Sequence, residues 1–442
     1  MASPDSGRPY SPSSSTSAQS SGSPMAQPSA LLSLPFPLRR QIWTSVLWPG
    51  GSSNVHLLRT CQQIHRETAP ILLEQPLVFQ SQTELFIWLE QVRDRNLEGV
   101  KSLTLYVRDL DMLSLEDDLS WPNASLIELY QLEADKILSM LKNLSGVKDL
   151  RIYHPSSVQS YLYGSFFTMI LKKVASLFPG LRTFSYHSDG HPVDFLKSFT
   201  NLRELRFTGY SKSTPMETLS TLSRLRHLTR VELIPPVIPE VNGGIDIDSG
   251  LPSTLSMTRD VIKGVRRLER LSIREVSDYL MSPAYLTASF IQSVDSRHRT
   301  VLQKFEVVVK FTPDASCQRA IQNLLRSSAL RHVALVWPKL DERIVRTLSR
   351  SLQTLRVAPF VNRPPHMVLT GLQARRSELP NLHTVSLVCN WDLSKLSSQV
   401  CLAMQCYDSA DYIQATSAPA FKAAIQALST VGVQTILDYG SD

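Results

Sequence analysis

The chain has 442 residues, of which 43% are hydrophobic and 19% are charged. This composition excludes a chain that is disordered throughout, because it supplies enough apolar surface for a core. No long uncharged apolar run occurs, and none stands at the start, so we expect neither a membrane span nor a secretory signal. The five cysteines, an odd number, do not suggest a disulfide framework, and we expect a cytoplasmic or nuclear protein.

The first residues form a segment of low complexity. The first thirty contain eleven serines and five prolines. Such a segment buries too little apolar surface to offset the entropy lost on ordering it. We therefore predict a disordered tail over residues 1–29.

A periodic pattern of apolar residues begins directly after this tail. Leu34, Leu38, Ile42 and Val46 recur every four residues, which predicts an amphipathic helix with these side chains on its apolar face. Prolines in its first turn are compatible with a helix, because the amide hydrogens there lack intrahelical partners.

A second helix is predicted after the Gly/Ser-containing loop at 48–53. We expect Pro70 to interrupt it, because proline cannot donate the hydrogen bond that a helix interior requires. Residues 77–79 predict a short strand, and the capping box at 81–84 opens a third helix that runs to about residue 95. The sequence thus predicts a helical module over residues 30–95.

The residues of this module resemble the F-box-like domain that is common in filamentous-fungal proteins. The resemblance covers about a sixth of the chain and is carried by Leu31-Leu32-Ser33-Leu34-Pro35, Leu38-Arg39, Ile42, the run 57–64 (Leu-Leu-Arg-Thr-Cys-Gln-Gln-Ile), Glu67, Pro70-Ile71-Leu72 and Phe79. It implies docking onto the Skp-type adaptor of a cullin-RING ubiquitin ligase core. The adaptor-docking residues that it implies are Leu34, Pro35, Leu38, Ile42 and Leu58. The alternative is a helical module that only caps the array behind it.

The rest of the chain repeats a hexapeptide of the form apolar-x-x-apolar-x-apolar. Its ten copies begin at Val100, Val147, Leu181, Leu202, Leu228, Leu268, Leu302, Leu330, Leu352 and Leu382, about 31 residues apart on average. Helical patterns lie between them, so the recurrence predicts a β-α array. The pattern resembles irregular leucine-rich repeats, although the asparagine that normally closes such a repeat occurs only at Asn390. An ordinary α/β domain with a parallel sheet is the alternative.

Strand alternation predicts one exposed surface for this array. Positions four and six of each hexapeptide should point into the core, and positions three, five and seven should line the exposed strand face. The target-binding residues expected there are Tyr106, Arg151, Tyr153, His187, Arg206, Arg230, Arg270, Arg274 and Arg356. Acidic side chains are interspersed among them and the net charge is only +7, so we expect a protein target rather than nucleic acid.

The sequence predicts no catalytic, metal or cofactor site. It contains no nucleophile elbow, phosphate loop or dinucleotide fingerprint. His187 and His191 have a spacing that metal ligands can use, but Gly190 and Pro192 place the pair at a turn rather than on a helix. We therefore expect a non-enzymatic protein, and a deep pocket with several titratable groups would contradict this.

The sequence as a whole predicts an α/β protein, with an N-terminal helical F-box-like module followed by an irregular leucine-rich-repeat-like β-α solenoid. The solenoid should span residues 96–400, with a loop insertion near 234–260, and residues 401–442 should form a C-terminal helical cap. The function expected is substrate recognition for an SCF-type cullin-RING ubiquitin ligase. The alternative is a protein-interaction scaffold.

Overall fold

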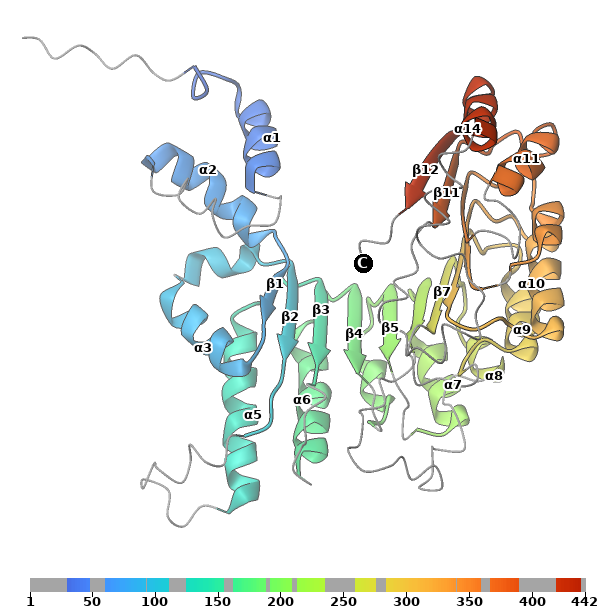
Figure 1. Cartoon of the computed structure of the whole chain (residues 1–442). Coiled ribbons are helices and arrows are strands. Elements are labelled where there is room, and N and C mark those ends of the chain that lie inside the picture. Colours follow the sequence, from blue (N-terminus) through green and yellow to red (C-terminus); the bar gives the residue numbers. More distant parts are fainter. Residues whose placement is uncertain are drawn as a thin grey trace, which may run out of the picture. The chain divides into compact units, whose positions relative to one another are not determined.

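The computed structural model shows two compact units, Met1–Leu72 and Leu73–Asp442, which we describe separately (Figure 1). The residues that the structure describes are 30–47, 60–92, 94–110, 125–154, 162–187, 191–208, 213–234, 259–275, 284–338, 340–358, 366–388 and 419–438. The expected tail at 1–29 and nearly all of the expected insertion at 234–260 lie outside these ranges.

The first unit consists of two helices, α1 (Phe36–Leu47) and α2 (Gln62–Leu73), of which α2 ends at the boundary between the units. Its core is small: Trp43, Leu47 and Ile71 are buried and a few partly buried residues pack around them. The prediction of which side of α1 is buried was wrong. Leu38 and Val46 are exposed, because the helix instead turns Trp43 and Leu47 toward its partner helix.

The second helix also differs from the expectation, because α2 runs through Pro70 without interruption. A proline lacks only its own amide hydrogen, so a single intrahelical hydrogen bond is lost at Pro70, which lies one turn from the end of the helix. Ile71, directly after it, is buried in the core of the unit, and this packing holds the last turn in place.

The second unit is built on one parallel sheet of twelve strands. The strands are β1 (Leu77–Phe79), β2 (Ser102–Tyr106), β3 (Asp149–Tyr153), β4 (Thr183–His187), β5 (Glu204–Thr208), β6 (Arg230–Ile234), β7 (Arg270–Glu275), β8 (Lys304–Val309), β9 (His332–Val336), β10 (Thr354–Val357), β11 (Thr384–Val388) and β12 (Gln434–Asp438). Their order in the sheet is their order in the sequence, so the chain advances by one strand at each repeat.

Helices connect most of these strands. They are α3 (Gln82–Gln91), α5 (Leu126–Lys142), α6 (Tyr163–Leu177), α7 (Pro215–Arg224), α8 (Arg259–Ile262), α9 (Ala288–His298), α10 (Ala315–Ser327), α11 (His366–Ala374) and α14 (Pro419–Thr430), with the 3-10 turns η2 (Asp94–Gly99), η3 (Asp194–Ser198) and η4 (Glu342–Thr347). Crossovers between parallel strands are right-handed. Because the chain adds every new strand at the same edge of the sheet, all of its connecting helices lie on the same side of the sheet. Figure 1 shows the helices on the outer side of the curved sheet and the strands on its inner side.

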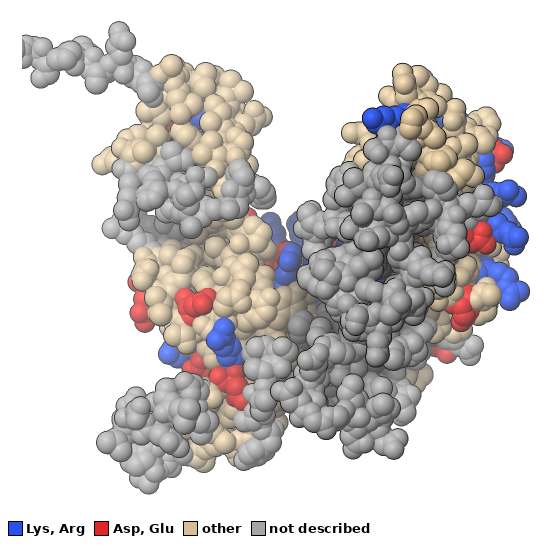
Figure 2. Space-filling model, in the orientation of Figure 1, with Lys and Arg blue, Asp and Glu red and all other residues tan. Residues whose placement is uncertain are grey.

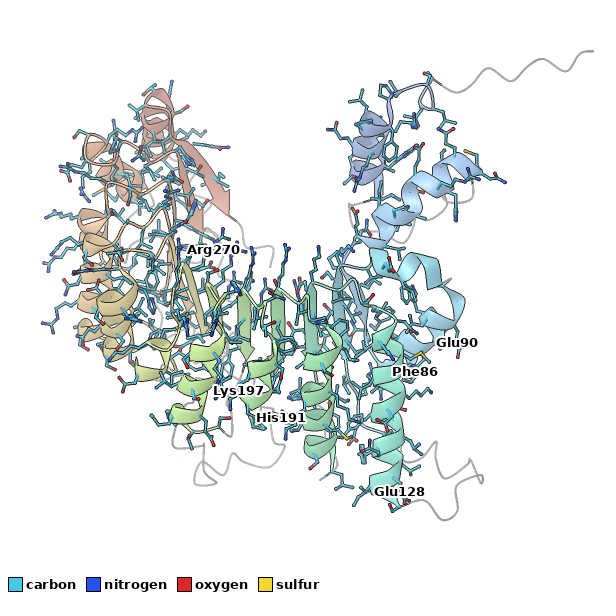
Figure 3. All side chains as sticks on the ribbon, turned by 180° about the vertical axis from the view of Figure 1, so that it is seen from behind. Phe86, Glu90, Glu128, His191, Lys197 and Arg270 are labelled. Carbon is cyan, nitrogen blue, oxygen red and sulfur yellow. The ribbon has the colours of Figure 1, made fainter. Side chains whose placement is uncertain are left out.

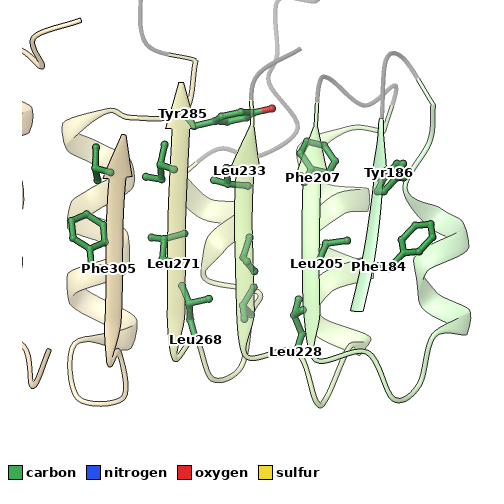
Figure 4. Packing of buried hydrophobic residues seen from close by; sticks show 14 of the residues in the cluster. Phe184, Tyr186, Leu205, Phe207, Leu228, Leu233, Leu268, Leu271, Tyr285 and Phe305 are labelled. Carbon is green, nitrogen blue, oxygen red and sulfur yellow. The ribbon is translucent and has the colours of Figure 1, made fainter. Parts of the chain in front are cut away.

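The ten hexapeptides each contribute one strand, β2 to β11, which confirms the β-α array. Their fourth and sixth positions are buried in every copy, as Leu271 and Ile273 of β7 illustrate. The parallel register places these positions side by side, so that Phe184, Leu205 and Phe305 form a layer against the helices (Figure 4). The repeated pattern therefore produces one continuous core along the unit.

Two expected domain boundaries need correction. The strand β1 pairs with β2, so it and the helix α3 belong to the sheet unit rather than to a module that extends to residue 95. At the other end the expected helical cap contains α14 but also β12, which pairs with β11 and extends the sheet. Both strands follow from the same cause, since a strand at the edge of a parallel sheet offers unpaired backbone groups to any adjacent segment.

One buried carboxyl group holds the connection after β7. Glu275 is fully buried, and its Oε1 accepts hydrogen bonds from the backbone amides of Tyr285 and Leu286. Burial raises the pKa of Glu275, although these amide bonds act in the opposite direction.

Candidate functional site

The inner side of the sheet carries no helix in the described part of the chain, and its side chains form a surface that we call the strand face. It consists of the outward-pointing residues of consecutive strands, at the third, fifth and seventh hexapeptide positions. The parallel register aligns them in rows that run across the strands. The charged members with described side chains are Asp149, Arg151, Glu204, Arg206, Arg230, Glu232, Arg270, Arg274, Lys304, Glu306 and Arg356.

Four neighbouring strands of this face, β5 to β8, are joined by a chain of ion pairs, the ion-pair ladder. Its members are Glu204, Arg206, Arg230, Glu232, Arg274, Lys304 and Glu306. On one side Arg206 Nε lies 3.2 Å from Glu204 Oε1 and 3.1 Å from Glu232 Oε2. The ladder continues through Arg274, whose Nη2 lies 2.8 Å from Glu306 Oε1 and whose Nε lies 3.3 Å from Glu232 Oε1.

The carboxylates of the ladder are more buried than its cations. The side chain of Glu306 is only 7% exposed, whereas those of Arg274 and Lys304 are 38% and 42% exposed. Burial opposes the ionisation of Glu306, but the charges of Arg274 and Lys304 outweigh it and lower the pKa of this carboxyl. Glu306 therefore stays ionised at neutral pH, and the ladder presents its cations, rather than its carboxylates, to the surroundings.

A basic row crosses the strand face beside the ladder. Register pairs Arg230 with Arg270, Arg270 with Lys304, and Lys304 with His332, so the four side chains are cross-strand neighbours. Arg270 is exposed and forms no ion pair with any residue that the structure describes. It lies on the inner side of the sheet, away from the helices (Figure 3). Like charges on adjacent strands repel each other. Arg230 and Lys304 are paired with the ladder carboxylates Glu204 and Glu306, so Arg270 is the cation of this row that lacks a described acidic partner.

His332 belongs to the same row as a neutral side chain. Burial, with help from the nearby Lys304 and Arg270 charges, lowers the pKa of His332. Its Nδ1 lies 2.8 Å from Thr354 Oγ1 on the next strand. The ring is thus positioned by a hydrogen bond and adds a polar, uncharged end to the basic row.

The first strands of the face carry aromatic side chains as well as charged ones. The rings of Tyr106 and Tyr153 lie with their centroids 5.5 Å apart, and the Tyr153 hydroxyl lies 2.9 Å from Ser185 Oγ. Beside them Arg151 pairs with Asp149 at 3.5 Å. Tyrosine and arginine are favoured in protein interfaces because they combine apolar area with hydrogen bonding.

The structure brings most of the expected target-binding residues onto one surface. Tyr106, Arg151, Tyr153, Arg206, Arg230, Arg270, Arg274 and Arg356 all occupy outward positions of strands that are neighbours in the sheet. His187 ends β4, but its side chain lies outside the described residues. The expected target-binding set contained cations, tyrosines and His187. Glu204, Glu232 and Glu306, acidic residues that the same strand pattern places on this face, neutralise several of these cations.

A second candidate surface lies on α1 in the first unit. Leu38 is 47% exposed, and Phe36 and Pro35, which precede it, are also exposed. Leu34 is half-buried and Ile42 packs partly against the unit's core. Leu58, the fifth expected docking residue, lies outside the described part of the chain. The Leu-Pro turn is held by Arg39, which donates hydrogen bonds to the carbonyl groups of Leu32 and Leu34.

The described residues hold no cluster of three or more His, Cys, Asp or Glu side chains that could bind a metal ion. His191, one of the two histidines with suggestive spacing, is buried against Phe167, and its Nδ1 lies 2.8 Å from Thr168 Oγ1. It is therefore part of the packing between α6 and the following turn. Among the described helices none is both long enough and apolar enough to cross a membrane.

No family model matches the chain, and no curated protein matches it. Several solved structures are similar, and two of them are described here. One is the leucine-rich repeat-containing protein LegL7 from Legionella pneumophila, with 15% identity and a TM-score of 0.34 over 77% of this chain and 83% of that one. The other is a protein from Bacteroides fragilis, with 11% identity and a TM-score of 0.35 over 73% and 78% of the two chains. Because both TM-scores are low, the repeat architecture is assigned from the chain's own strand order.

Proposed function

We propose that the protein is a non-catalytic interaction scaffold whose strand face binds an acidic segment of a protein target. The observation that carries this proposal is the strand face itself, a long row of ordered side chains that no described helix covers. It carries seven cations against four carboxylates, which gives an excess of positive charge. The other members are tyrosines and small polar residues, which suit a protein interface.

The ion-pair ladder supports this proposal by fixing side chains before a partner arrives. Arginine loses much conformational freedom when it binds, and that loss weakens an interface. Arg206 is held by one carboxylate of its own strand and one of the next strand, and Arg274 by one carboxylate of each neighbouring strand, so part of this entropy is already lost in the free protein. Arg270 has no such described partner and is therefore the member of the face best suited to pair with a carboxylate of the target.

A protein partner suits the charge distribution better than nucleic acid does. In Figure 2 the basic and acidic side chains of the described residues are interspersed over the visible surface. Within the strand face itself, carboxylates lie between the arginines. A phosphate backbone would be repelled by these carboxylates, whereas a protein segment can match a mixed pattern residue by residue.

The experiment begins with cross-linking of the full chain in a cell extract, which identifies a protein that the wild type captures. That protein is then purified, and its affinity for the wild type and for two variants is measured. The variant combines Arg230→Ser with Arg270→Ser, and the control combines Arg346→Ser with Arg350→Ser, which removes the same charge from exposed positions outside the strand face. We expect the first variant to bind at least about tenfold more weakly and the control to bind normally. Equal binding by all three chains would refute a role for the strand face.

For the first unit we propose docking onto a Skp-type adaptor, so that the scaffold would deliver its target to a cullin-RING ubiquitin ligase core. The support is the exposed Leu38 and Phe36 on a helix whose other side already supplies the unit's core. An exposed apolar stripe on a small unit is costly in water and is typical of a docking surface. The mechanism would be proximity, in which the bound target gains a high effective concentration near the ligase.

The test is co-purification with a purified fungal Skp adaptor. Leu38→Asp, combined with Pro35→Ala, should abolish recovery, because a carboxylate would have to be desolvated in the apolar contact. Met216→Asp is the matched control, since Met216 is 71% exposed on α7 of the other unit. Circular dichroism should show that all three chains are folded. If the wild type does not bind the adaptor, the ligase role fails and the interaction scaffold remains.

A further inference from the structure

A second charged feature lies on the helix side of the sheet unit, apart from the strand face. It is a hollow of about 430 Å³ with five basic residues in its wall: Arg224, Arg226, Lys263, Arg266 and Arg297. Ser223 and Gly264 complete the lining, so it contains no acidic side chain. We call this feature the basic hollow.

Three successive repeats build the basic hollow at equivalent places. It lies where α7, α8 and α9 end and the chain turns toward the next strand. These helices are neighbours, with α8 packed against both α7 and α9 (Figure 1). Each turn therefore adds its cations next to those of the previous one.

The close approach of the turn after α8 to helix α7 depends on a glycine. A Cβ on Gly264 would lie 2.9 Å from Leu219 Cδ1 and 3.1 Å from the Leu219 carbonyl oxygen, so no larger residue fits without a shift. Across the same contact Arg266 Nε donates a hydrogen bond of 3.3 Å to the carbonyl of Ser223 at the end of α7. The backbone and at least one guanidinium are thus already in place.

Helix ends explain only part of this concentration of charge. Arg224 and Arg297 lie in the last turns of α7 and α9, where a cation interacts favourably with the helix dipole. Arg226 and Lys263, however, lie beyond the ends of their helices. Lys263 pairs with Asp260 at 3.0 Å, while Arg226 and Arg297 form no ion pair with another described residue. Mutual repulsion among these cations is thus largely uncompensated within the described part of the chain.

We propose that the basic hollow is a binding site for a compact polyanion that carries several phosphoryl groups. Guanidinium groups bind phosphoryl oxygens through two parallel hydrogen bonds, and five cations match several negative charges on one small molecule. The volume of the hollow falls within the range of small-molecule sites. This site is independent of the proposed adaptor and target roles, because none of its residues belongs to the strand face or to the first unit.

The test is isothermal titration of the full chain with inorganic tripolyphosphate, with orthophosphate and sulfate as weaker anions. We expect saturable binding of one tripolyphosphate per chain, which weakens as salt is added. Arg226→Ser combined with Arg297→Ser should weaken this binding by about tenfold, because two charged contacts to the anion are lost. Both side chains are exposed, so we expect the fold of this variant to remain intact. The lysine versions of both changes keep the charge but lose the paired hydrogen bonds of the guanidinium, so their affinity should lie between those of the serine variant and the wild type.

The matched control is again Arg346→Ser with Arg350→Ser, which removes two exposed arginines from the η4 region of the same unit. It should bind tripolyphosphate like the wild type. The proposal is overturned if the wild type shows no saturable binding, if the control loses as much affinity as the variant, or if an RNA oligonucleotide or an acidic peptide binds the hollow more tightly than tripolyphosphate does.

Discussion

The two helices of the first unit are joined by one ionic cluster, and its removal is a sharp test of how this unit is stabilised. Arg39 on α1 contacts Glu67 on α2 through two hydrogen bonds, Nε to Oε2 at 2.9 Å and Nη2 to Oε1 at 2.6 Å. Trp43 Nε1 donates to the same carboxylate at 3.0 Å. The side chains of Arg39 and Glu67 are only 12% and 11% exposed, so this pair is not an ordinary surface ion pair.

Glu67→Ala would leave the guanidinium of Arg39 and the indole N–H of Trp43 without their acceptor. Hydrogen bonds to charged groups contribute about 1.5–3 kcal/mol each, and water will replace part of this. We therefore expect a loss of about 2 kcal/mol. Among the described residues the core of the unit has three buried hydrophobic side chains, so this loss is a large part of its stability.

Hydrogen exchange measured by mass spectrometry gives the result for each helix. A loss of about 2 kcal/mol should speed exchange of the α1 and α2 amides by about thirtyfold, with no change in the sheet unit. The control is Asp135→Asn, which breaks the exposed Lys173–Asp135 pair at 2.8 Å and should change exchange in α5 and α6 very little. Unchanged exchange in the Glu67 variant would refute the view that this cluster holds the unit together.

The same cluster predicts how the first unit responds to acid. The Arg39 guanidinium, aided by Trp43 and Gln63, outweighs burial and lowers the pKa of Glu67 from 4.5 to about 2. A lowered pKa means that the stabilisation is present above the unfolded value and is lost as the pH falls through the folded one. Protection of α1 should therefore decrease between about pH 4.5 and pH 2 in the wild type. In Glu67→Gln it should change little over that range.

Two further predictions concern the sheet unit, and denaturant unfolding checks both. Burial raises the pKa of Glu275, so the wild type gains stability as the pH falls and this carboxyl is protonated. Glu275→Gln should therefore be more stable than the wild type at pH 7. It should lose this advantage below the ordinary pKa of glutamate. An advantage that persists at low pH would contradict this reasoning. Gly146→Ala should destabilise the unit by about 1–3 kcal/mol, because the new Cβ would lie 2.2 Å from the Glu98 carbonyl oxygen. Gly180→Ala, with no atom within 4 Å, is its control and should be nearly neutral.

The repeated strands could be predicted from the sequence because one constraint acts ten times. A residue pair such as Leu271 and Ile273 must face the helices, and a slip of one residue would expose both. The parallel register then aligns the outward-pointing residues of each strand with those of its neighbours. This is why the rows of the strand face follow from the hexapeptide alone.

The first helix could not be placed in this way, because it has apolar residues on two sides. Leu38 and Val46 share one stripe, and Trp43 and Leu47 share another. Periodicity cannot decide between them, since either stripe satisfies a helical pattern. The deciding contact is Glu67 with Arg39 and Trp43, which joins residues more than twenty positions apart.

The basic hollow was missed for a related reason. Its cations lie in three separate turns, and none of these turns is unusual by itself in a basic protein. Only the packing of α7, α8 and α9 brings Arg226 and Arg297 to one place. A search for cations at equivalent positions of successive repeats could have found it, because a repeat architecture turns sequence period into spatial proximity.

The two charged surfaces differ in how their cations are compensated, and this difference predicts different partners. On the strand face Arg206 and Arg274 already hold carboxylates, so an incoming partner must compete with Glu232 and gains mainly through Arg270. A partner then benefits from matching both signs, which favours the mixed surface of a protein. In the basic hollow only Lys263 is paired with a described carboxylate, that of Asp260, so affinity should rise with the number of negative charges on the ligand. On the two proposals made above, the same fold would select a protein on one side of its sheet and a small polyanion on the other.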